Sequence, residues 1–197
     1  MQARIGDIGV VRQGLNRSGR SAGARPGDVK VRLVSGSNVQ DDRIVTEGLE
    51  EVSIDVNELT EKHILQPNDV VVTGKSTSVK AAYVPSDIGP AVANSTMLVV
   101  RPRHPDMGLY LWWLITSSRG RRMVESIMVA SATLWSLQPR TLADLQVPIP
   151  SPLELRLFCD LIQQSERAYW RAREAADIRR TTLRDHIVGH LLRNGSS

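Results

Sequence analysis

Short runs of apolar residues, separated by Pro, Gly and Asn turns, predict a series of short strands in the first hundred residues. One run alternates apolar residues with Lys30 and Arg32, which is the pattern of a half-buried strand. The run V-V-V-T follows the turn Pro67-Asn68-Asp69 and is apolar enough for a fully buried strand. The predicted strands cover residues 29–34, 70–73, 81–84 and 97–100, with 81–84 returning beside 70–73.

Helical spacing dominates the second half of the chain. Residues 109–116 and 120–128 are predicted to form helices, with Arg119, Arg121 and Arg122 at their junction. Pro148, Pro150 and Pro152 fix extended backbone, and residues 153–192 then contain no proline. This last stretch predicts a helix of about 60 Å, longer than a domain of this size needs.

The predicted long helix carries an imperfect heptad stripe that is rich in small residues. Its members follow a 4-3 spacing and are Leu155, Phe158, Ile162, Ser165, Tyr169, Ala172, Ala176, Arg179 and Leu183. Two interpretations are open: the stripe packs against a helix of another subunit, or the helix folds back on its own domain. The predicted boundaries are a domain over 1–150, a helix over 151–194 and a tail over 195–197.

Charge is unevenly distributed around the net value of +4. Residues 1–32 carry a net +5, residues 41–69 a net −7 and residues 74–140 a net +5. A fold that joins the two basic segments, with the acidic one facing away, would attract a polyanion such as nucleic acid. A charge-mixed, solvated surface is the alternative.

The single cysteine, Cys159, excludes a disulfide within one chain, and no apolar run approaches the roughly 20 residues that span a membrane. Cys159 lies among apolar residues, which predicts a buried position. The N-terminus lacks the apolar segment of a secretion signal. We therefore expect a protein of the reducing cytoplasm, with no membrane partner.

Motifs of enzymes and metal sites are missing from the sequence. The run V-V-V-T-G-K-S-T suggests a phosphate-binding loop, but Asp69 stands where that motif needs its first glycine. His186 and His190 share one helix face without a third ligand at useful spacing. We expect no catalytic residue, no metal and no cofactor, which leaves a binding module. Three polar loops are candidates for contact with DNA, at residues 12–25, 74–80 and 131–135.

The order of motifs resembles one half of a type I restriction-modification DNA specificity (S) subunit. The opening A-R-I-G-D-I-G, the run L-Q-P-N-D-V-V-V, the helix Y-L-W-W-L-I-T-S-S-R-G and the run from Ser131 to Leu153 carry the resemblance. Asn68 replaces the glycine that is usual in the second motif. Leu153-Glu154-Leu155-Arg156 departs from the usual start of the helix.

The resemblance implies an α+β fold: a mixed α/β target-recognition domain with a twisted, largely antiparallel sheet, followed by a long helix for coiled-coil packing. It implies a non-catalytic subunit that reads double-stranded DNA and directs an adenine-N6 DNA methyltransferase. A homodimer through the helix is expected, and a restriction or translocase subunit is left open.

By loop position, the residues expected to contact DNA are Arg12, Asn16, Arg17, Arg20, Lys75, Ser76, Thr77, Lys80 and Thr133. The expected assembly residues are Leu155, Phe158, Ile162, Tyr169, Ala172, Ala176 and Leu183. Two other functions remain open: a structural or regulatory defence protein that keeps the fold without reading DNA, and an enzyme of an unrecognised class.

Overall fold

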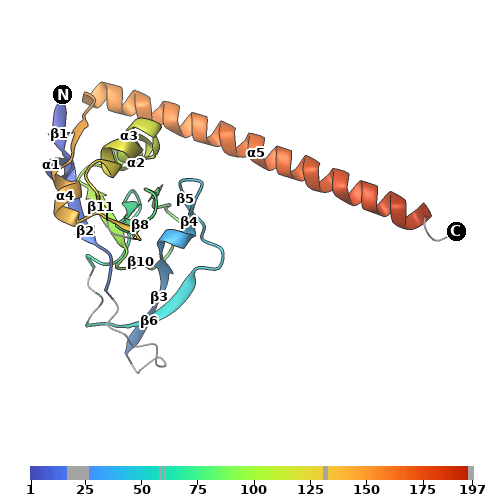
Figure 1. The fold of residues 1–197 in the computed structure, drawn as a ribbon, viewed down its shortest axis with the longest axis horizontal. Helices are drawn as coiled ribbons and strands as arrows, with labels where there is room; N and C mark the ends of the chain where they lie inside the picture. The colour runs from blue at the N-terminus through green and yellow to red at the C-terminus, as the bar shows by residue number, and fades with distance from the viewer. Residues whose placement is uncertain (17–26, 58, 60, 131–132, 195–197) are drawn as a thin grey trace. The chain divides into compact units, whose positions relative to one another are not determined.

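The computed structural model describes residues 1–16, 27–57, 59, 61–130 and 133–194, and its fold is drawn in Figure 1. The chain divides into two compact units, Met1–Arg156 and Leu157–Ser197. The first unit holds the strands and the short helices, and the second consists of most of one long helix. The functional boundary expected after residue 150 stays a prediction.

The first unit is an α+β structure of short strands and short helices. Its strands are β1 (Gln2–Arg4), β2 (Gly9–Gln13), β3 (Asp28–Val34), β4 (Val39–Gln40), β5 (Arg43–Ile44), β6 (Glu50–Asp55), β7 (Val70–Thr73), β8 (Lys75–Ser76), β9 (Ala81–Tyr83), β10 (Ala91–Ala93), β11 (Met97–Pro102), β12 (Val129–Ala130), β13 (Trp135–Ser136) and β14 (Gln146–Pro148). Its helices are α1 (Ile5–Ile8), the 3-10 turn η1 (Gly36–Asn38), α2 (Pro105–Thr116), α3 (Ser118–Glu125) and α4 (Pro139–Asp144). The long helix α5 spans Pro152–Asn194.

The central sheet has the strand order β2-β11-β7-β9-β5-β4. Its pairs are antiparallel except β9 with β5, so the expectation of a largely antiparallel sheet is confirmed. Every residue of β7 is buried, as the apolar run predicts, and Val71 belongs to a buried hydrophobic cluster with residues of β3, β9, β10 and β11. The predicted return strand is β9, which pairs antiparallel with β7.

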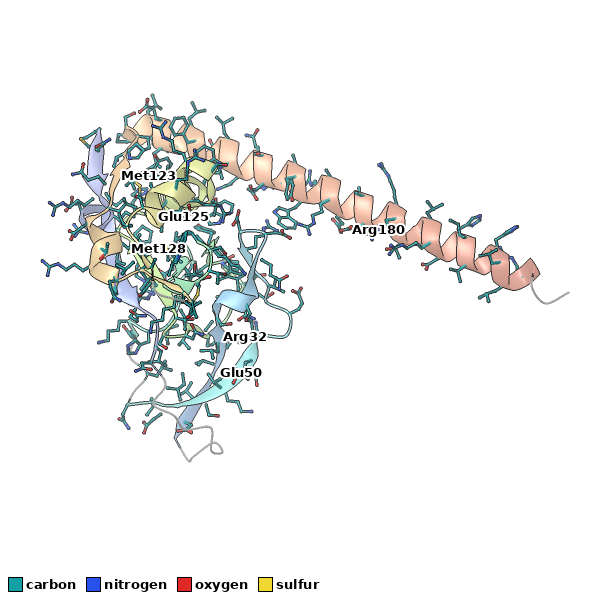
Figure 2. The ribbon with its side chains drawn as sticks, viewed as in Figure 1. Arg32, Glu50, Met123, Glu125, Met128 and Arg180 are labelled. Carbon is teal, nitrogen blue, oxygen red and sulfur yellow. The ribbon has the colours of Figure 1, made fainter. Side chains whose placement is uncertain are left out.

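Strands β3 and β6 form an antiparallel ribbon that joins the rest of the unit through β10, which runs parallel to β3. In Figure 1 this ribbon extends away from helices α2 and α3. Val31, Val52, Ile54 and Val92 form its own small core. Figure 2 labels Arg32 of β3 and Glu50 of β6, whose strands lie side by side.

The first and last strands of the unit close the domain. Strand β1 pairs antiparallel with β14, and the backbone amide of Ile149 donates a hydrogen bond to the oxygen of Met1 at 2.8 Å. The Tyr110 hydroxyl on α2 donates to the Pro148 carbonyl at 2.8 Å and so joins α2 to β14. Backbone and side chains therefore fix the segment that immediately precedes α5.

The structure has helices α2 and α3 where two helices were predicted, but both begin earlier than expected, at Pro105 and Ser118, and α3 ends earlier. Helical pattern predicts a helix to residue 128, but α3 ends at Glu125 and residues 129–130 form β12. A strand of two residues carries too little periodicity to be separated from the helix before it.

Helix α5 has 43 residues, about 65 Å at the usual rise, and confirms the predicted long helix. It runs through Gly189 without interruption. None of the helices in the described part of the chain combines the length and apolar character that a membrane crossing requires.

Candidate nucleic-acid interface

Two of the three predicted DNA-contact loops are joined by strand pairing. Strand β13 pairs antiparallel with β8, so that Trp135 lies opposite Ser76 and Ser136 lies opposite Lys75. The backbone amide of Leu137 donates to the Gly74 oxygen at 2.8 Å. With β12 on the other side of β13, these segments form a three-stranded sheet, β12-β13-β8.

The described start of the remaining loop reaches the same edge through the turn between β10 and β11. The amide of Leu15 donates to the Ala93 oxygen at 2.7 Å. The Thr96 oxygen accepts from the amides of Gly74 and Lys75, at 2.7 and 3.1 Å. The turn of residues 94–96 therefore lies between the first and second predicted loops. We call the surface formed by residues 13–16, 74–80, 94–96 and 129–136 the loop edge, as far as these residues are described.

Glycine and asparagine allow the close approach of backbones at the loop edge. A Cβ atom on Gly14 would lie 2.0 Å from the Asn94 oxygen, so no other residue fits without movement of the backbone. The Asn94 Oδ1 atom accepts from both the amide and the hydroxyl of Thr96, at 3.1 and 2.7 Å. This is the local turn chemistry that asparagine favours.

Buried Thr73 holds both ends of the second loop. Its hydroxyl donates to the Ser78 oxygen at 3.1 Å, and it accepts from the Lys80 amide at 3.0 Å. The Lys80 ammonium group lies 3.5 Å from the Gly36 oxygen. The loop of residues 74–79 is therefore presented from a fixed base.

The predicted contact residues differ in exposure. Asn16, Lys75, Thr77 and Thr133 are exposed, and Ser76 and Lys80 are half-buried. Arg17 and Arg20 lie outside the described residues. Direct contact between any of these residues and DNA stays a prediction.

Arg12 lies in a buried ion cluster behind the loop edge. Arg101 donates two hydrogen bonds to fully buried Asp69, at 2.8 and 2.7 Å, and Arg12 Nη2 lies 3.6 Å from the same carboxylate. Burial lowers the pKa of Arg12, as does repulsion from Arg101, while Asp69 opposes both. Arginine still remains charged at physiological pH. The cluster ties β2 and β11 to the turn before β7, which gives Arg12 a structural role whether or not it also reaches DNA.

The segments that contribute to the loop edge lie within long stretches of sequence that contain no acidic residue. Asp and Glu are absent from residues 8–27, 70–86, 88–105 and 126–143, which together carry Arg and Lys. Such a surface attracts polyanions.

The acidic segment does not simply face away from the basic segments, as a basic cleft would require. Strand β6 pairs with β3, which sets Glu51 opposite Arg32, and Asp42 forms an ion pair with Arg121 at 2.6 Å. Asp42 therefore stabilises the fold by pairing with a base far away in sequence. The described residues of the loop edge contain Lys75 and Lys80 and no acid.

Sequence analysis did not single out the turn of residues 94–96, which contains no charged residue. The apolar side chains of the small sheet, Val129, Leu134 and Trp135, are 68%, 42% and 37% exposed. Leu134 and Trp135 lie within the third predicted loop, but Thr133 was the residue of that loop expected to contact DNA. Among the described residues, no group of three or more His, Cys, Asp and Glu side chains could hold a metal ion.

The assembly residues expected on α5 vary in exposure along the helix. Leu155 and Ile162 are buried, and Phe158 is at the margin of exposure. From Tyr169 onward the predicted stripe is exposed, including Ala172, Ala176 and Leu183. Cys159 is buried, as expected.

No protein-family model matches the sequence, and no curated protein matches it either. Solved structures do match. The HsdS subunit from Thermoanaerobacter tengcongensis is 15% identical, with a TM-score of 0.58 over 94% of this chain and 46% of that chain.

A second match is a chain from a solved structure that describes complex assembly and conformational transition of the type I R-M system. This chain is also 15% identical to the protein. It has a TM-score of 0.50 over 94% of this chain and 46% of that chain. The protein therefore spans about half the length of these structures, and over that length it has the fold of a type I restriction-modification S subunit.

Proposed function

We propose that this protein is a sequence-specific DNA recognition subunit that performs no chemistry and directs an adenine-N6 DNA methyltransferase to its target. The observation that carries the proposal is the convergence of the predicted DNA-contact loops on one edge of the first unit. This edge is built from segments without acidic residues and presents exposed Lys75, Thr77 and Asn16. The shared fold with the HsdS subunit supports the same role.

The division of labour follows from the chemistry of the side chains. Lys and Arg pair with guanine in the major groove, Asn and Gln pair with adenine, and Ser, Thr and backbone amides position phosphates. The loop edge supplies donors of these kinds but, among the described residues, no cluster suited to a metal. Methyl transfer, with the adenine flipped out of the duplex, belongs to the partner subunit. A restriction or translocase subunit is compatible with the same role.

Helix α5 supports an assembly function. From Tyr169 onward it leaves large apolar side chains, including Tyr169, Ile178 and Leu183, more than half exposed, which is unusual for a helix that has no partner. Its charge is also polarised. Residues 152–166 contain three acids and one base, a net −2, while residues 167–193 contain three acids and seven bases, a net +4.

This polarity favours an antiparallel pair of α5 helices, because each acidic start would lie beside the basic end of its partner. We propose that two copies pair in this way and read two half-sites related by two-fold symmetry. Light scattering at two salt concentrations tests this arrangement. A dimer at low salt that weakens at high salt supports it, and a monomer at high concentration contradicts it. The cytoplasmic location expected from the sequence remains a prediction.

The test of DNA recognition is selection from a pool of random duplexes. The full chain is used alone and in complex with a methyltransferase subunit encoded beside it. We expect a single enriched motif, interrupted or palindromic, and methylated adenines at that motif in cells. Absence of any enriched motif in both samples contradicts the proposal and favours a structural or regulatory protein.

A matched pair of lysine variants separates recognition from general charge. Lys75→Ala is expected to weaken binding across all sequences and to reduce the dependence on log salt by about 1, as loss of one phosphate contact does. Lys62→Ala removes an exposed charge from the acidic segment and is expected to leave binding unchanged. Equal effects of the two variants would show that the loop edge is not the DNA-contact surface.

A further inference from the structure

The small sheet β12-β13-β8 is exposed to solvent on both of its faces. Residues directly opposite each other in an antiparallel pair share a face. Trp135 therefore lies on one face with Ser76 and Ala130, and Lys75 lies on the other with Ser136 and Val129. Each face presents at least one exposed side chain: Trp135 on the first, and Lys75 and Val129 on the second.

Trp135 is exposed although the same unit buries another tryptophan efficiently. Trp112 on α2 is 5% exposed, and its indole nitrogen donates to the backbone oxygen of Asp42 at 2.8 Å. Trp135 is 37% exposed and stands beside exposed Leu134, within a stretch of otherwise small and polar residues. Exposed aromatic and aliphatic side chains that gather at one point of a surface indicate a contact site.

The surroundings of Trp135 favour DNA as the occupant. The three strands of the small sheet contain Lys75 and no acidic residue, and Lys80 ends the loop that follows β8, so the charge of this part of the surface complements a polyanion. The major groove admits a two-stranded β-ribbon, and within the small sheet β13 and β8 form an antiparallel pair of this kind. Within that groove, the thymine methyl group is the apolar feature that a side chain without charge can recognise.

We propose that the sheet β12-β13-β8 enters the major groove and that Trp135 is a specificity-determining residue, which contacts the methyl group of a thymine. This inference rests on the proposed function, because it assigns one base contact within the same interface. In this arrangement Lys75, on the opposite face of the sheet, contacts a phosphate of the DNA backbone. The apolar contact explains why this loop presents a tryptophan in place of a further polar residue.

Uracil substitution tests the inference, since replacing thymine by deoxyuridine removes one methyl group and leaves base pairing intact. The probe is the best duplex selected by the full chain, or by its complex with the methyltransferase subunit, with each thymine replaced in turn. The wild-type protein is expected to lose about fourfold in affinity at one thymine, the effect of one methyl-sized apolar contact. Trp135→Ala is expected to bind the thymine and uracil duplexes equally at that position.

Trp113→Ala provides the matched control, because Trp113 is also exposed but lies on α2. It is expected to retain the fourfold difference of the wild-type protein. A wild-type protein that is indifferent to every uracil substitution, or a Trp135→Ala variant that keeps the difference, overturns the inference and leaves DNA recognition standing. A Trp135→Ala variant with an unchanged motif but lost methyltransferase binding also overturns it, since the sheet would then dock a protein. If no motif is selected at all, the proposed function fails and the inference fails with it.

Discussion

Arg121 on α3 and Asp42 in the β4–β5 turn are 79 residues apart and form an ion pair in which one nitrogen, Nη2, donates to both carboxylate oxygens, at 2.6 and 2.7 Å. Asp41 and Asp42 have φ values of 48° and 61°, as the two central residues of a type I′ hairpin require. Aspartate adopts this left-handed conformation at some cost. The ion pair therefore holds a strained hairpin against α3.

Arg121→Lys is expected to lower the free energy of unfolding by about 1–2 kcal/mol, because the single nitrogen of lysine cannot contact Asp42 and also replace the hydrogen bonds of Nε and Nη1. The ion pair itself is partly screened by solvent. Arg121 also donates to the oxygens of Val79 and Thr116, at 2.7 and 2.9 Å. Urea denaturation measures the change, with exposed Arg122→Lys as the control. Equal stability of the two variants would show that the ion pair contributes nothing measurable.

Asn68 occupies a left-handed position, with φ of 73°, in the turn before β7. Its side-chain oxygen accepts a hydrogen bond from the Tyr83 hydroxyl. We expect Asn68→Val to destabilise the protein by about 2 kcal/mol, because a β-branched residue is strained at this φ and the hydrogen bond is lost. Asn68→Gly loses the same hydrogen bond without the strain. Similar denaturation midpoints for the two variants would contradict the conformational explanation.

The strands around Asn68 were predictable from sequence because their signals are local. Apolar runs and Pro, Asn and Gly turns predict β7, β9 and β11, and the absence of proline predicts α5. The φ of Asn68 also explains why asparagine replaces glycine in this motif, since both tolerate the left-handed region.

The arrangement of the loop edge was not predictable in the same way. Composition identified the loops separately, but their convergence depends on pairings such as Trp135 with Ser76, which join distant segments. The ion pairs of Asp42 and Asp69 likewise cannot be read from local charge counts.

Gly14 lies where β2 meets the turn of residues 94–96. A Cβ atom there would lie 2.0 Å from the Asn94 oxygen and 2.7 Å from the Ala93 oxygen, and both are backbone atoms that cannot rotate away. Gly14→Ala is expected to destabilise the first unit by roughly 2–3 kcal/mol and to separate the two loops. Thermal denaturation measures this change.

Gly36→Ala is the control for Gly14→Ala, because the nearest atom to its new Cβ would lie at an ordinary 3.4 Å. It should unfold close to the wild-type temperature. A Gly14→Ala protein that unfolds at the temperature of this control would show that the close approach relaxes without cost.

Glu154 and Ser151 form a reciprocal cap at the start of α5. The Ser151 amide donates to Glu154 Oε2 at 2.8 Å, and the Glu154 amide donates to the Ser151 hydroxyl at 3.4 Å. Hydrogen bonds from Ser151, first its side chain and then its backbone, lower the pKa of Glu154. The cap therefore stabilises the helix above the ordinary glutamate pKa of about 4.3, and this contribution is lost as the pH falls through the lower pKa of the folded state.

Carboxyl NMR titration is expected to show the lowered pKa in the wild-type protein and a return toward the ordinary value in Ser151→Ala. Ser165→Ala, farther along α5, provides the control and should leave the Glu154 titration unchanged. A Glu154 that titrates identically in wild type and in Ser151→Ala would show that the cap does not form in solution.

Tyr110 joins α2 to the strand before α5. Its contribution to stability depends on pH in the opposite sense to that of Glu154. Burial raises the pKa of its hydroxyl, which donates to the Pro148 oxygen. The folded state therefore favours the neutral phenol. Its contribution to stability is complete below the ordinary tyrosine pKa of about 10 and is lost as the pH rises through the higher pKa of the folded state.

Tyr110→Phe removes both the hydrogen bond and this titration. The variant is expected to be about 1 kcal/mol less stable at neutral pH. Its free energy of unfolding should also fall less than that of the wild-type protein between pH 9 and about 11, the range that surrounds the ordinary tyrosine pKa. Urea denaturation across this range measures both effects. Because every other ionisable group is the same in both proteins, the difference between the two curves reports Tyr110. Parallel curves would show that its hydroxyl is solvated.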